Sequence, residues 1–183
     1  MAWTVRAITR AMLPVLLVLT LVEVVSGLVL GSFEATLLTY PSLLVLVPVT
    51  IGTAGNLGSI LAVRLSTAFH LGLLSFSPRD DQLSGNALAI IGLAVTLFPA
   101  VGAGAWGLAS LTVGAKLGLG TVVLVAFSSG VALAVVAVSV SLSATYAAYR
   151  LGLDPDDVVM PVVTNTCDVF GVVVLFVVVV VLV

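Results

Sequence analysis

Long apolar stretches alternate with short polar segments along the whole chain. A membrane-spanning helix needs about 20 mostly apolar residues, because it crosses roughly 30 Å of hydrocarbon at about 1.5 Å per residue. Five stretches reach that length, at residues 11–33, 41–63, 86–108, 117–149 and 158–183. The last contains VVVLFVVVVVLV, which has no strict alternation, and a lone open strand could not satisfy its backbone in lipid. We therefore predict an all-α integral membrane protein with five transmembrane helices in one domain, residues 1–183.

The composition supports the membrane assignment and excludes several classes of protein. Hydrophobic residues make up 61% of the chain and charged residues only 8%, whereas about a quarter of a soluble domain is charged. The six Lys and Arg residues are scattered singly, so no nucleic-acid-binding patch is expected. One cysteine excludes an intrachain disulfide framework. We therefore expect a multi-pass protein of the cell membrane that is surrounded by membrane lipid.

The charges in the predicted loops indicate an orientation. With five spans, one side of the membrane holds Arg6, Arg10, Arg64, Arg79 and Arg150, and the other holds Lys116. Because positive loops stay inside, we predict a cytoplasmic N-terminus and an external C-terminus. The first apolar run exceeds the length of a signal-peptide core and lacks an A-x-A-like cleavage site, so we expect an uncleaved anchor.

Two carboxylates fall inside predicted spans. Six of the eight acidic residues lie near span ends or in loops, whereas Glu23 and Asp168 lie within spans. Counting from the nearest cytoplasmic charges places Asp168 about 16 Å deep and Glu23 about 20 Å deep. An acidic side chain at the centre of a membrane helix costs about 2.5–3.5 kcal/mol on insertion scales, so such groups normally face a cavity, a partner or an ion.

Polar and small residues mark one face of the second span and one face of the fifth. The fifth span carries Pro161, Thr164, Asn165, Asp168 and Gly171 at helical spacing. The second span carries Gly52, Gly55, Asn56 and Ser59, and Asn56 has a depth of about 12 Å. Because the two faces lie at similar depths, we predict that they form one site. Close packing of small residues between helices is the alternative explanation.

The residue types in this predicted site favour a hard divalent cation. Carboxylate, hydroxyl and amide oxygens suit Mg²⁺, Ca²⁺ or Mn²⁺, and they can also bind Co²⁺. Mg²⁺ retains several of its waters, which suits a wide site with one or two carboxylates. Five spans cannot be divided into two equal repeats within one chain, so a symmetric pathway would need a second chain. Two Asp168 carboxylates on a two-fold axis would then match the charge of a divalent cation.

Three other features have simpler interpretations. The segment Asp154 to Asp157 suits a helix N-terminus, with Asp at the N-cap and Pro at the first helical position. A cation-binding role for these carboxylates is the alternative. Cys167 is expected to be a small buried filler, and His70 is assigned no role.

Two motifs resemble a known family of membrane proteins. PVTIGTAGNLG followed by Arg64, and LGLDPDDVVMPVVTNTCDVFG at the start of the fifth span, resemble the membrane domain of MgtE-type magnesium channels. RLSTAFHLG is similar to a pattern in the related solute carrier family 41. The resemblance covers essentially the whole chain.

The resemblance implies a dimer of five-helix domains with spans two and five lining a central cation pathway. Asp168 would be the pore aspartate that holds a hydrated Mg²⁺, and Thr164 would present its carbonyl to the pore. Gly52, Gly55 and Asn56 would form the Gly-rich pore segment. Ser59 stands where the bacterial channels usually have a second Asn. Their cytoplasmic regulatory region is not expected here, since only about ten residues precede the first span.

We therefore expect a divalent cation channel or transporter, with Mg²⁺ favoured, rather than an enzyme. Two alternatives remain open: a non-conducting partner subunit of a heteromeric transporter, and a Na⁺- or H⁺-coupled Mg²⁺ exchanger in which Glu23 carries the coupling ion. An intramembrane aspartyl hydrolase is disfavoured because no second catalytic group accompanies Asp168. Pairing could be with an identical chain or with a similar one.

Overall fold

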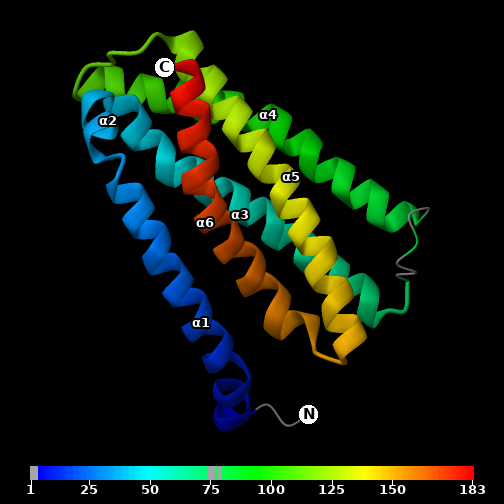
Figure 1. The fold of residues 1–183 in the computed structure, drawn as a ribbon. Helices are drawn as coiled ribbons and strands as arrows, with labels where there is room; N and C mark the ends of the chain where they lie inside the picture. Colours follow the sequence, from blue (N-terminus) through cyan, green and yellow to red (C-terminus); the bar gives the residue numbers. More distant parts are fainter. Residues whose placement is uncertain (1–3, 74–76, 78–79) are drawn as a thin grey trace.

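The protein is a bundle of long helices (Figure 1). The computed structural model describes residues 4–73, 77 and 80–183, and these residues form helices and no strand. The helices are α1 (Val5–Gly31), α2 (Glu34–Thr39), α3 (Pro41–His70), α4 (Asp81–Thr112), α5 (Leu119–Leu151) and α6 (Pro155–Leu182). All except α2 are long and apolar enough to cross a membrane. The prediction of an all-α protein with five candidate spans is therefore confirmed.

The connections alternate between the two ends of the bundle, as the predicted topology requires. The start of α1, the end of α3, the start of α4 and the α5–α6 connection lie toward one end, and the α4–α5 connection and the C-terminus lie toward the other (Figure 1). Arg6 and Arg10 in the first turns of α1, and Arg150 near the end of α5, belong to the first end. Arg79 lies outside the described residues. The side of the membrane that each end faces stays a prediction.

The helices differ from the predicted spans at their ends. The six-residue helix α2 between α1 and α3 was not predicted, because one and a half turns are too short to show a periodicity. α3 continues to His70, well past the end predicted from hydropathy. Its last two turns contain Arg64, Leu65 and Ala68, which have high helix propensity. Apolar content predicts where a helix crosses the membrane and not where it ends.

α3 lies in the middle of the bundle and contacts α4, α5 and α6. Leu43, Leu46, Leu61 and Leu65 on α3 are fully or almost fully buried. Glycine permits the closest approach between α4 and α5, since a Cβ on Gly130 would lie 2.0 Å from Cγ of the buried Phe98. α1 packs on α6 and is largely exposed, with apolar side chains such as Leu21 and Leu28 facing outward. This exposed surface is compatible with contact to lipid.

Candidate ion-binding site

Three helices enclose a groove that contains both intramembrane carboxylates. The groove has a volume of about 480 Å³ and is lined by α1, α3 and α6. α1 contributes Glu23, α3 contributes Gly52, and α6 contributes Asp168. Asp168 lies halfway along α6, and Glu23 lies near the middle of the apolar part of α1. The structure thus brings charged and small residues from three helices to the middle of an apolar bundle.

The Glu23 and Asp168 carboxyl groups line the same groove. They are near enough to each other to interact electrostatically. Two ionised carboxylates at such a distance repel each other, so a cation between them is favourable. Sequence reasoning had recognised Glu23 as intramembrane but had not placed it in the site. Its similar depth was the available signal, but depth does not reveal which helix faces meet.

The Gly-rich face of α3 has two different environments. A Cβ on Gly52 would meet nothing within 4 Å, whereas Gly55 is buried, with its Cβ position 3.9 Å from Cβ of Cys167. A Cβ on Gly58 would lie 2.4 Å from Cγ1 of Val163 on α6. Gly52 therefore opens onto the groove, while Gly58 allows α3 to pack closely on α6. A Cβ at Gly55 would make only an ordinary van der Waals contact. Cys167 is fully buried in this contact, in agreement with its predicted role as filler.

The remaining predicted residues line α3 and α6 outside this groove. Asn56 is exposed, and the Ser59 hydroxyl donates to the Gly55 carbonyl at 2.9 Å within its own helix. The Thr164 hydroxyl likewise donates to the carbonyls of Met160 and Pro161, at 3.1 Å each. These hydroxyls are satisfied by their own helices. The groove residues among the predicted set are Gly52 and Asp168.

Asn165 has an acceptor without a partner. Its amide nitrogen donates to the Pro161 carbonyl at 3.1 Å, but its buried Oδ1 has no hydrogen-bond partner. A buried acceptor that stays unpaired costs about 1–3 kcal/mol. This oxygen, one turn from Asp168 on α6, is available to a water or to a cation.

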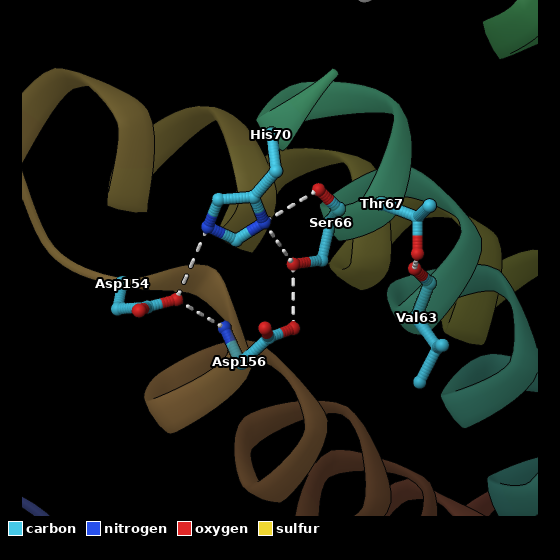
Figure 2. A network of polar contacts seen from close by, with 6 residues as sticks. All are labelled: Val63, Ser66, Thr67, His70, Asp154 and Asp156. Carbon is cyan, nitrogen blue, oxygen red and sulfur yellow. Dashed lines mark hydrogen bonds and ion pairs between the residues drawn. The ribbon is translucent and has the colours of Figure 1, made fainter. Parts of the chain in front are cut away.

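A second polar cluster lies where α3 ends and α6 begins (Figure 2). Asp154 caps α6 as predicted, because its side chain accepts from the backbone N–H of Asp156 at 3.1 Å. His70, the last residue of α3, places Nε2 3.7 Å from Oδ1 of Asp154. The Ser66 hydroxyl donates to Asp156 at 2.6 Å. Sequence reasoning gave His70 no role, because 84 residues separate it from Asp154 along the chain.

A family model described as "MgtE: Divalent cation transporter" matches residues 47–178. The match covers most of the chain. The chain belongs to the MgtE family. No solved structure matches it.

Membership of the MgtE family establishes the general class of the protein. MgtE proteins are divalent cation transporters, and the five apolar helices make this chain a multi-pass membrane protein. The family is one of transporters and not a class of enzymes. The matched residues include Gly52 and Asp168 but exclude Glu23 and the rest of α1. A contribution of Glu23 to ion binding therefore has to be argued from this structure.

Proposed function

We propose that this chain transports Mg²⁺ along the groove between α1, α3 and α6, and that Asp168 binds the ion at the middle of the membrane. The observation that carries the proposal is the meeting of Asp168 and Glu23 in one groove, halfway through an apolar bundle. Intramembrane carboxylates are costly, and they mark ion pathways when they face a cavity. Of the two groove carboxylates, Asp168 is the one within the part of the chain that matches the family.

The size and chemistry of the groove favour a hydrated Mg²⁺. Six waters of about 30 Å³ each occupy roughly 180 Å³, and the groove has about 480 Å³. Two carboxylates supply the charge that balances a divalent cation, and their oxygens are hard ligands. Mn²⁺, Co²⁺ and Ca²⁺ share these ligands, so selectivity for Mg²⁺ would follow from retention of the water shell.

The exposed face beside the groove suggests how the pathway is completed. Gly52 and Asn56 lie uncovered on α3, next to a groove that already holds carboxylates from two helices. We place a second copy of the chain, or a similar chain, against this face in the cell membrane. Thr164, Asn165 and Ser59 would then lie near the central axis, where their backbone or amide oxygens could contact the water shell of the ion.

Uptake of Mg²⁺ into liposomes that contain the purified protein tests the proposal. We expect wild-type protein to admit Mg²⁺ and Asp168→Asn to lose most of this flux, because the substitution removes the charge from the midplane site. Asp157→Asn is the matched control, since it removes an exposed carboxylate at the start of α6. Equal flux through Asp168→Asn and wild type would contradict the site assignment. An inactive wild type would favour the partner-subunit alternative.

The presence of both Glu23 and Asp168 in one groove favours a second candidate, a coupled exchanger. A groove with two carboxylates can hold a second cation when Mg²⁺ leaves. Imposed Na⁺ and H⁺ gradients separate the two functions, because an exchanger would move Mg²⁺ against its own gradient and a channel would not.

A further inference from the structure

Three potential metal ligands meet at the end of the bundle, away from the groove. His70 comes from the last turn of α3, whereas Asp154 and Asp156 come from the N-cap and first turn of α6. One ligand atom from each residue lies within 4.8 Å of the other two. Figure 2 shows the imidazole and both carboxylates turned toward one another.

The hydrogen bonds of His70 determine which ring nitrogen is available. Nδ1 lies 3.0 Å from the carbonyl oxygen of Ser66, which can only accept, so Nδ1 carries the hydrogen. In the neutral ring Nε2 then presents a lone pair to Oδ1 of Asp154 at 3.7 Å, which exceeds hydrogen-bond length. Nε2 of His70 and Oδ1 of Asp154 are then two acceptors that face each other, and a cation between them could bind to both.

Ser66 gives the cluster the outer shell that metal sites commonly have. Its carbonyl fixes the tautomer of His70, and its hydroxyl donates to Oδ1 of Asp156 at 2.6 Å. Ser66 is itself only 2% exposed, so both hydrogen bonds start from a fixed position. Backbone carbonyls and hydroxyls in this role orient metal-ligating imidazoles and carboxylates.

We propose that His70, Asp154 and Asp156 bind a divalent first-row transition metal such as Zn²⁺, Mn²⁺ or Co²⁺. One imidazole and two carboxylates suit these ions better than Mg²⁺, which prefers oxygen ligands and its own waters. Metal–ligand distances of about 2.0–2.2 Å require the three atoms to draw closer, which the exposed side chains can do by rotating. The bound ion would link the end of α3 to the start of α6, and these two helices form walls of the groove. The inference does not depend on whether the groove conducts ions.

The chain contains one histidine, which makes a direct test possible. In tag-free protein labelled with ¹⁵N-histidine, we expect Zn²⁺ to shift the Nε2 resonance of His70, and Mg²⁺ at the same concentration to leave it in place. Asp156→Asn should weaken the Zn²⁺ response at least about tenfold, and Ser66→Ala should weaken it by about tenfold. Asp157→Asn is the matched control and should respond like wild type.

Two results would overturn the proposal. One is an Nε2 resonance that moves with pH but not with Zn²⁺, which would make the cluster an ion pair between a protonated His70 and Asp154. The other is an undiminished Zn²⁺ response in Asp156→Asn. A thermal melt by circular dichroism verifies that each variant is folded. Because the resonance reports only on His70, failure here leaves the Mg²⁺ flux assay for the groove unaffected.

Discussion

Glu23 is the charged groove residue that was not among the predicted ion-binding residues. It lies outside the residues that match the family, yet it lines the same groove as Asp168. A single chain therefore already holds two carboxylates in one groove, which the expectation of one Asp168 from each of two chains did not include. The charge that attracts a divalent cation is present before any second copy is added.

Neutralising Glu23 should weaken transport without abolishing it. We expect Glu23→Gln to require about tenfold more Mg²⁺ for half-maximal flux, equivalent to about 1.4 kcal/mol of ion binding, because one of two nearby charges is lost. Liposome flux at a series of Mg²⁺ concentrations measures this shift. Glu34→Gln, at the start of α2 and outside the groove, is the control. An unchanged concentration dependence in Glu23→Gln would remove Glu23 from the site.

The groove was predictable from sequence only in part. The position of Asp168 within an apolar run already indicated an ion site, and Gly52, also predicted for that site, lines the same groove as Asp168. The spacing of residues along one helix shows which of them share a face but not which neighbouring helix that face meets. For this reason the sequence did not place Glu23 beside Asp168 or His70 beside Asp154. The hydroxyls of Thr164 and Ser59 bond within their own helices, and their roles in the pathway stay predictions.

At the scale of the helices, the lengths of the apolar stretches predicted the number of long helices well. They predicted poorly the residues at which these helices end. All five long helices were expected, because each carries enough apolar residues to cross the membrane. The contacts that hold them together were less visible in the sequence. Gly130 gave no signal among many small residues, yet it is the position where Phe98 of α4 packs against the backbone of α5.

Adding a methyl group at Gly130 should disrupt the contact between α4 and α5. Phe98 is fully buried and a Cβ on Gly130 would lie within 2.0–2.3 Å of three of its ring atoms, so the ring or the helix must move. We expect Gly130→Ala to lower the free energy of unfolding by about 1–3 kcal/mol. Gly92→Ala on α4, where a Cβ meets nothing within 4 Å, should be neutral or slightly stabilising. Chemical denaturation in detergent compares the two, and equal effects would contradict the packing described.

At the scale of the whole molecule, the unpartnered face of α3 is the feature that bears on assembly. Apolar content predicts contact with lipid for all outward faces alike. The small and polar residues of the second span were the sequence signal that distinguished this face from the others. The structure adds that the Gly52 and Asn56 face adjoins the groove. The proposed pathway requires that this face meet another chain.

Cross-linking tests that arrangement. Native Cys167, which is fully buried, is replaced by Ala so that the introduced cysteine is the only thiol. A cysteine is then introduced at Asn56. We expect Asn56→Cys to form a disulfide-linked dimer in membranes under mild oxidation, since two copies of the face would meet. Leu88→Cys on the exposed surface of α4 is the control and should remain monomeric. Equal cross-linking at both positions would indicate random collision and not a defined interface.

The proposed function requires that a divalent cation bind in the groove lined by Asp168 and Glu23. Diffraction from crystals grown with Mn²⁺, which shares the oxygen ligands of Mg²⁺ and scatters anomalously, can locate such an ion. We expect an anomalous peak in the groove, contacting Asp168 directly or through its waters, that disappears in Asp168→Asn. A groove without any anomalous peak, in crystals where Mn²⁺ is bound elsewhere on the protein, would contradict it.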